Sequence, residues 1–135
     1  NTETATPADI EQLVYLQREL NGVLGEEIHK ELSSHEQERT IPHETYIIRA
    51  GESIAAKANL IGASRNYFQI GGVITKHEYR NNGFARKAVS YLCQDNFSKG
   101  KQYAAIFVDN SNSPAIKAYE SIGFTKIDDY ILAEY

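Results

Sequence analysis

Residues 73–85 form the first group whose types and spacing suit chemistry. Apolar Val73-Ile74-Thr75 is followed by Arg80-Asn81-Asn82-Gly83-Phe84-Ala85, which predicts a strand, a turn and the start of a helix. A helix N-terminus presents unpaired backbone N–H groups and a partial positive charge. Gly83 lets the backbone approach a phosphate closely, and asparagine tolerates left-handed backbone. Together with Arg80, these features predict a pyrophosphate site. The competing interpretation is a turn that binds nothing.

Residues 112–124 form the second group. Asn112-Ser113-Pro114 predicts a helix start, because asparagine caps helices and proline suits the first turn. Gly123 predicts the end of that helix. A capped amphipathic helix with a buried aromatic residue explains most of this stretch. It leaves unexplained why Asn112, Tyr119 and Gly123-Phe124 have the spacing that they have.

The first half of the chain must supply part of the scaffold for these groups, and it predicts two helices. Thr6-Pro7-Ala8-Asp9 is typical of a helix start, with a capping threonine, an early proline and an acid that completes a capping box. An apolar stripe of helical period follows, and Asn21-Gly22 ends it. The polar stretch Gly25–Glu38 predicts a second, shorter helix. Any strand before Thr6 would be very short.

The rest of the chain alternates strands with helices. Strands are expected at Tyr46–Ala50, Ser53–Gly62, Tyr67–Thr75, Tyr103–Val108, Phe124–Ile127 and Tyr130–Ala133. The two helices fall between them, from the Asn-Asn-Gly turn to about Ser98 and from Asn112 to Gly123. Gly71 and Gly72 interrupt the third strand, and paired glycines favour a β-bulge or a close approach of the backbone. Hairpins followed by a strand–helix–strand unit predict an α/β domain whose mixed sheet carries helices on its faces.

Composition limits the classes of protein that this chain can belong to. Its 135 residues fit one domain, residues 1–135, and the net charge of −4 argues against a general nucleic-acid binder. No apolar run approaches the ~18 residues that cross a bilayer, so no membrane partner is expected. The single cysteine cannot form an internal disulfide, which favours a cytoplasmic location.

Together, the two groups resemble the GCN5-related N-acetyltransferase superfamily. Its phosphate loop, Arg/Gln-x-x-Gly-x-Gly/Ala, corresponds here to Arg80-Asn81-Asn82-Gly83-Phe84-Ala85. Its later motif, Asn-x-x-Ala-x-x-x-Tyr-x-x-x-Gly-Phe, corresponds with every spacing matched to Asn112, Ala115, Tyr119, Gly123 and Phe124. The resemblance covers essentially the whole chain in the family's order of elements, and the residue at position 84 is similar to the FR47-like branch.

Two positions depart from the family's pattern. Asn81 stands where the family usually has glycine, and His77 stands where it often has proline. Asparagine is the best substitute for glycine at positive φ. Neither change removes a charge or a donor, so cofactor binding is expected to survive both.

The resemblance implies an N-acetyltransferase that moves an acetyl group from acetyl-coenzyme A directly to an amine. The pantetheine arm would pair with the backbone of Val73–Thr75, where a free N–H polarises the thioester carbonyl. The loop Arg80–Ala85 would hold the pyrophosphate, and Asn112 would help to hold the pantetheine. Tyr119 is the candidate general acid that returns a proton to the departing thiolate. A packed tyrosine is the competing interpretation, since the chain has nine.

The sequence does not decide which group removes the proton of the amine. A water chain would serve, and each side chain that could serve is also explained as a solvated surface group; they are His77, Glu78, Glu44 and His43. Cys93 lies on an apolar helix face and is interpreted as a small buried residue rather than a nucleophile. The histidines form no zinc pattern, so no metal is expected.

The acceptor is a small-molecule or peptide amine that the sequence does not name. Glu26, Glu27 and Glu31 would border its cleft in this family, which favours a cationic acceptor such as a polyamine, although a solvated acidic helix explains them equally well. A homodimer is compatible with the resemblance. The alternative function is a non-catalytic acyl-coenzyme A-binding module with the same fold, which would bind the cofactor without transfer to any amine.

Overall fold

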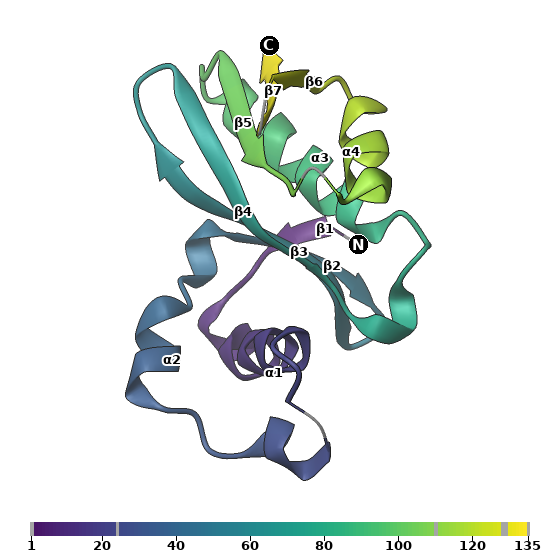
Figure 1. The fold of residues 1–135 in the computed structure, drawn as a ribbon. Coiled ribbons are helices and arrows are strands. Elements are labelled where there is room, and N and C mark those ends of the chain that lie inside the picture. Colours follow the sequence, from purple (N-terminus) through teal and green to yellow (C-terminus); the bar gives the residue numbers. More distant parts are fainter. Residues whose placement is uncertain (1, 24, 110, 128–129, 135) are drawn as a thin grey trace.

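A single mixed β-sheet forms the centre of the protein (Figure 1). The computed structural model describes residues 2–23, 25–109, 111–127 and 130–134. Within these ranges the strands lie in the order β1-β2-β3-β4-β5-β7-β6. Their bounds are Thr2–Thr4 for β1, Thr45–Ala50 for β2, Ser53–Ala63 for β3, Tyr67–Thr75 for β4, Tyr103–Phe107 for β5, Thr125–Ile127 for β6 and Tyr130–Glu134 for β7. Neighbouring strands are antiparallel except β4 and β5, which are parallel, so the predicted α/β fold with a mixed sheet is confirmed.

Helices cover both faces of this sheet. The α-helices of the described residues are α1 (Ile10–Leu20), α2 (Ser34–Arg39), α3 (Phe84–Ser98) and α4 (Ser113–Glu120). Short 3₁₀ helices join them to the strands at η1 (Pro7–Asp9), η2 (Gly25–His29), η3 (Pro42–Glu44) and η4 (His77–Tyr79). Figure 1 shows α1 and α2 on one side of the sheet, and α3 and α4 on the other.

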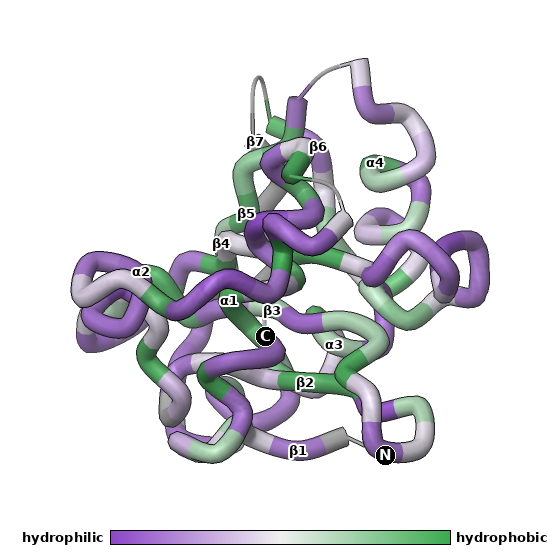
Figure 2. The backbone as a smooth tube through the Cα atoms, turned by 90° about the horizontal axis from the view of Figure 1, so that it is seen from below, coloured by the Kyte–Doolittle hydropathy of each residue, from purple (hydrophilic) through white to green (hydrophobic). Residues whose placement is uncertain are grey.

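Alternation along the strands produces two layers of core. Ile47 of β2 packs with Leu13 and Leu16 of α1 in one apolar cluster. Its neighbours Tyr46 and Ile48 belong to the second cluster, which is formed with the inner face of α3. Successive side chains of a strand point to opposite faces, so one strand serves both layers. Hydropathy along the backbone follows the same division, with apolar segments at the sheet and polar segments outside it (Figure 2).

The prediction of one helix over Gly25–Glu38 is wrong. The structure has η2, a loop and then α2, and the extended backbone of Ser33 (φ −75°, ψ 158°) separates the two helical pieces. Arg18 of α1 explains the break, because its Nη1 donates to the backbone carbonyls of Ile28 (2.9 Å) and Lys30 (2.7 Å). Those carbonyls would otherwise be acceptors within a continuous helix. A tertiary contact therefore outweighs local helix propensity here.

Two local predictions in the same half of the chain are confirmed. The strand before Thr6 exists and is short, since β1 spans Thr2–Thr4. The hairpin expected from the strands Tyr46–Ala50 and Ser53–Gly62 also exists, because Ala50 pairs with Ser53 and Gly51 has a φ of 64°. A two-residue hairpin loop of this kind favours glycine at positive φ.

Candidate active site

The sheet opens between its two parallel strands. β4 and β5 pair from Tyr67–Tyr103 to Ile70–Ile106, and no described pair follows. β4 nevertheless continues to Thr75, so the stretch from Gly71 onward has lost its neighbour on the β5 side. Backbone groups along such an edge can pair with an extended ligand as if it were a strand. This is the stretch that the sequence predicted for the pantetheine arm.

A β-bulge in β4 coincides with the opening. β3 advances by two residues from Lys57 to Asn59 while β4 advances by three from Ile74 to Gly71, so β4 carries one extra residue. Gly72 lies within this step with a φ of 57°. A Cβ at Gly71 would stand 2.5 Å from Ile61 Cδ1, so a side chain there would displace the side chain of Ile61. The bulge predicted from the paired glycines is confirmed, and bulges bend the strand that holds them.

A buried lysine holds the bulge in place. Lys57 Nζ donates to the carbonyl oxygen of Gly72 (2.8 Å) and to Asn59 Oδ1. Asn59 Nδ2 donates to Thr45 Oγ1 (2.8 Å), which in turn donates to the carbonyl of Ile41 (2.8 Å). Burial lowers the pKa of Lys57 to about 8, so its ammonium form still prevails at neutral pH. The chain of hydrogen bonds therefore ties β4 to β3, β2 and the loop before η3.

The predicted phosphate loop has the backbone that an anion site needs. η4 follows β4, Asn81 (φ 66°) and Gly83 (φ 75°) adopt left-handed conformations, and α3 begins at Phe84. Asn82 Nδ2 donates back to the carbonyls of Tyr79 (3.1 Å) and Arg80 (3.0 Å), which fixes the turn. No side chain caps α3, and its first turn holds no acid. The N–H groups there are left available to an anion.

Arg80 stands at the entrance to this turn. Its side chain is exposed, and its Nε has a long contact of 3.4 Å with the carbonyl oxygen of Thr75. The guanidinium is therefore free to exchange that weak contact for a phosphate oxygen. Phe84 contacts the Tyr79 ring with a centroid separation of 5.9 Å, and Lys87 Nζ lies 5.7 Å from the Phe84 ring centroid. A cation thus precedes the predicted phosphate turn and another follows it, at Arg80 and Lys87.

The second motif forms α4 and its surroundings. Asn112 Oδ1 accepts a hydrogen bond from the Ala115 N–H (3.3 Å), so this side chain caps α4 and its amide hydrogens remain for a ligand. Tyr119 is buried, and its ring lies 6.1 Å from that of Phe124. Burial raises its pKa to about 12, which keeps the phenol protonated. Tyr119 belongs to the same apolar cluster as Ile70, the last residue of β4 that pairs with β5.

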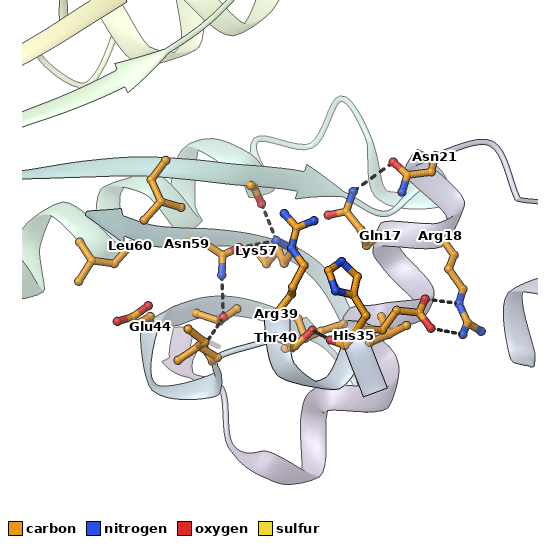
Figure 3. A pocket seen from close by; sticks show the side chains of 17 residues that line it. Gln17, Arg18, Asn21, His35, Arg39, Thr40, Glu44, Lys57, Asn59 and Leu60 are labelled. Atoms are coloured by element: carbon orange, nitrogen blue, oxygen red, sulfur yellow. Dashed lines mark hydrogen bonds and ion pairs between the residues drawn. The ribbon is translucent and has the colours of Figure 1, made fainter. Parts of the chain in front are cut away.

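On the other face of the sheet, a pocket of about 590 Å³ lies between the sheet and α1 and α2 (Figure 3). Gly72 lines this pocket, so it reaches the bulge. The charged and imidazole side chains of its lining are Arg18, His35, Glu36, Arg39, Glu44 and Lys57. The pocket and the open edge of β4 therefore meet at one residue. Such an arrangement can bring a second reactant to a ligand that lies along β4.

The acidic residues that suggested a cationic acceptor lie elsewhere. Glu26 and Glu27 are exposed on η2, and Glu27 pairs with Lys30 (2.6 Å). Glu31 lines a separate hollow beside Tyr15. None of the three lines the pocket at the bulge. The interpretation as solvated surface acids fits them better.

The four candidate bases come from two elements, η3 and η4. Glu44 lines the pocket. His77 and Glu78 are exposed on η4 outside it, and Glu78 pairs with Lys76 (3.0 Å). The side chain of His43 lies outside the described residues.

Three residues of the site escaped the sequence reasoning: Lys57, Asn59 and Arg39. A charged residue inside the apolar strand around Ile54–Leu60 was a signal for Lys57, because a lone lysine on a buried strand needs a partner. No comparable local signal marked Arg39.

Two classes of site are not found in the described part of the chain. No group of three or more histidine, cysteine, aspartate or glutamate side chains there could hold a metal ion. Among the same residues, no helix has the length and apolarity to cross a membrane. Cys93 is buried, as predicted, and burial raises the pKa of its thiol to about 12, which leaves it unreactive.

Comparison with known proteins identifies relatives of this fold. The model of the family described as FR47-like protein matches residues 47–133, well over half of the chain. PaiA N-acetyltransferase from Thermoplasma acidophilum, solved with coenzyme A, superposes with a TM-score of 0.73 at 16% identity, covering 100% of this chain and 98% of its own. YncA from Salmonella typhimurium, solved with acetyl-coenzyme A, gives 0.77 at 13% identity, with 99% and 92% covered.

A third solved structure gives the same result. An N-acetyltransferase from Staphylococcus aureus Mu50 has a TM-score of 0.75 at 14% identity, with 99% of this chain and 97% of its own chain covered. No curated protein sequence matches the chain. At such low identity the superpositions show that the fold is shared.

Proposed function

The chain belongs to the FR47-like branch of the GCN5-related N-acetyltransferase superfamily, and on that premise we propose that it transfers an acetyl group from acetyl-coenzyme A to an amine. The observation that carries the proposal is the opening between β4 and β5, which leads directly into the uncapped N-terminus of α3. β4 offers an edge for the extended pantetheine arm, and α3 offers backbone N–H groups for the phosphates. The solved relatives with coenzyme A or acetyl-coenzyme A support the choice of donor.

The residues of the loop fit the pyrophosphate. Left-handed backbone at Asn81 and Gly83 turns successive N–H groups toward one side, and Gly83 has no side chain to obstruct them. Arg80 supplies a charge-assisted hydrogen bond from the rim, since its contact with Thr75 is weak. Phe84 and Ala85 begin α3 and contribute backbone rather than charge. Asn82 positions the turn through its own hydrogen bonds.

The reactive end of the donor would lie beside the bulge. Val73, Ile74 and Thr75 present backbone to it, while the side chain of Ile74 is buried in the core. An N–H at this edge would polarise the thioester carbonyl as negative charge develops on its oxygen. Asn112, at the start of α4, would donate its remaining amide hydrogens to the pantetheine.

The chemistry requires two proton transfers. As the nitrogen of the acceptor bonds to the acetyl carbon, the carbon–sulfur bond breaks and the thiolate leaves. Tyr119 is the proposed proton donor to that thiolate, because it stands at the tyrosine position of the motif and its phenol is protonated at neutral pH. A pKa of about 12 makes this phenol a weaker acid than a thiol, so it stabilises the thiolate first as a hydrogen-bond donor. Glu44 is the candidate acceptor for the amine proton, since it lines the pocket that ends at Gly72.

The buried lone cysteine needs no oxidising environment, which agrees with a cytoplasmic enzyme.

Thermal unfolding with saturating acetyl-coenzyme A tests the proposal. At ~100 times Kd the donor should stabilise the wild type by about 2.7 kcal/mol, which is several degrees for a domain of this size. Arg80→Ala should weaken binding about tenfold and reduce that stabilisation to about 1.4 kcal/mol. Arg65→Ala, an equally exposed arginine on the turn between β3 and β4, is the matched control and should keep the full shift.

The possible results separate the functions. No shift with acetyl-coenzyme A or coenzyme A in the wild type would refute donor binding and with it acetyl transfer. A normal shift without release of free thiol in the presence of any amine would point instead to the acyl-coenzyme A-binding module. Thiol release that depends on an added amine would support the transferase.

A further inference from the structure

We infer that the acceptor is an amine that also carries a carboxylate, such as an α-amino acid with an apolar side chain, and that Arg39 and Lys57 bind the carboxylate. This inference rests on the acetyl transfer proposed above and concerns the pocket that ends at the bulge. The charges of that pocket, its apolar walls and its contact with β4 at Gly72 suit such an acceptor (Figure 3).

The lining of the pocket holds more cations than acids. Arg18 is fully occupied, because Glu36 pairs with it at 2.6 Å and three backbone carbonyls take its remaining donors. That pair contributes no net charge to the pocket. Arg39 and Lys57 are the other cations of the lining, and Glu44 is its other acid. The pocket is therefore cationic, although the whole chain has a net charge of −4.

Neither remaining cation is neutralised by an acid of the described residues. The two acceptors of Lys57 are an amide oxygen and a backbone carbonyl, both uncharged. An ammonium group has three N–H donors, so one is left for a ligand. The side chain of Arg39 has no hydrogen bond or ion pair with any described residue. Figure 3 shows its guanidinium extending from α2 toward Lys57, with His35 beside it.

Arg39 is held where it can act. It is the last residue of α2, whose first turn is capped by Ser33 and whose Glu36 is fixed by the pair with Arg18. Thr40 Oγ1 donates to the carbonyl oxygen of Glu36 (2.9 Å) and closes the end of the helix. The planar fork of an arginine matches the two oxygens of a carboxylate, and a nearby ammonium adds a third donor.

The walls of the pocket indicate the rest of the acceptor. Leu13 and Val14 of α1 and Leu60 of β3 line it together with Ile41 and Ile61. Ile41 and Ile61 are 38% and 56% exposed, so apolar surface of this wall is open to a ligand side chain. The pocket thus combines an anion site with an apolar wall. An amino acid with an aliphatic side chain has both complements.

An acceptor held by its carboxylate in this pocket has its amino group near β4. Lys57 binds the carbonyl of Gly72, so a carboxylate held by Lys57 lies next to the bulge and places a nearby amine at the open edge of β4. Glu44 lines the same pocket and would attract the amine. The carboxylate of such an acceptor would offset the excess positive charge of the pocket. A polyamine, by contrast, would bring more positive charge to a cationic site.

Matched acceptors test the inference. We would compare leucine with leucinamide and 3-methylbutylamine, which keep the amine and the side chain but lack the carboxylate, and include spermidine as the polyamine. Wild-type kcat/KM for leucine should exceed that for the two analogues without a carboxylate by at least about tenfold. Arg39→Gln should remove about tenfold or more of the leucine activity and leave the analogues nearly unchanged. Arg65→Gln is the control and should preserve the preference.

The binding of N-acetyl-leucine in the presence of coenzyme A gives a readout that does not depend on turnover. It should bind the wild type and lose about tenfold or more in affinity with Arg39→Gln, while its amide should bind weakly to both. Equal use of leucine and leucinamide, a preference for spermidine, or no binding of the acetylated acid would each overturn the inference and leave acetyl transfer standing. Failure to bind acetyl-coenzyme A would instead refute the proposed function.

Discussion

Replacing Gly72 with alanine should lower the free energy of unfolding by more than the cost of placing alanine in left-handed backbone. The φ of Gly72 is 57°, and an L-residue in left-handed backbone costs about 1–2 kcal/mol. The new Cβ would also stand 2.7 Å from Asn59 Oδ1 and 2.9 Å from Lys57 Nζ. One of these atoms must move, and each is part of the buried hydrogen-bond network. Loss of a buried hydrogen bond costs about 1–3 kcal/mol. The expected total is about 2–5 kcal/mol.

Gly51→Ala is the control that separates the two contributions. Gly51 has a φ of 64°, but a Cβ there would meet nothing within 4 Å. The variant should therefore lose only the backbone contribution, about 1–2 kcal/mol. The difference between the variants, about 1–3 kcal/mol, corresponds to roughly 4 °C or more in Tm for a domain of this size. Thermal unfolding followed by circular dichroism measures both variants directly.

Acetyl-coenzyme A titration then links the bulge to the site. Gly72→Ala should weaken donor binding because the edge of β4 next to residue 72 is displaced, whereas Gly51→Ala should bind normally. Equal Tm values for the two variants would refute the idea that the hydrogen bonds of Lys57 and Asn59 at the bulge stabilise the protein. Unchanged donor affinity in Gly72→Ala would show that the bulge does not shape the donor edge.

Two further predictions concern buried ionisable groups. Tyr119→Phe should lower kcat by about a hundredfold and leave the Kd of acetyl-coenzyme A unchanged, as steady-state kinetics and titration would show; a normal kcat would exclude Tyr119 as the proton donor. For Lys57, burial lowers the folded-state pKa from 10.5 to about 8, so between these pH values the unfolded chain binds the proton and the folded chain does not. Wild-type stability should therefore rise by roughly 3 kcal/mol more than that of Lys57→Met between pH 8 and 10.5 in denaturant unfolding, and parallel pH profiles would contradict the burial of an ionisable Lys57.

Features that depend on local backbone chemistry could be predicted from the sequence. Glycines at 51 and 72 are needed where φ is positive, and the structure has a turn at the first and a bulge at the second. Asn81 likewise adopts a φ of 66°, as its replacement of glycine indicated. The strand–turn–helix around it follows from the same rules. The roles of these residues in binding stay predictions.

Features that depend on contacts between distant segments could not be predicted. The break between η2 and α2 exists because Arg18, from α1, takes the carbonyls of residues that precede α2. Lys57 and Arg39 line one pocket although they lie on β3 and α2, and no periodicity connects them. Glu26, Glu27 and Glu31 suggest a cationic acceptor because they are close together in the sequence. Their position relative to the sheet, which the sequence does not show, leaves them outside the pocket.

The short pairing between β4 and β5 also affects the cohesion of the whole molecule. One half of the sheet, β1–β4, meets the other, β5–β7, along only the stretch from Tyr67–Tyr103 to Ile70–Ile106 among the described pairs. Apart from that seam, α3 and the apolar cluster beneath it join the halves. A donor bound along the rest of β4 would contact both halves and hold them together. Without the donor, the protein would open at this seam before either half unfolds. Resistance to proteolysis and to mechanical force would then increase when the donor is bound. The cell's supply of donor would therefore help to set the lifetime of the protein.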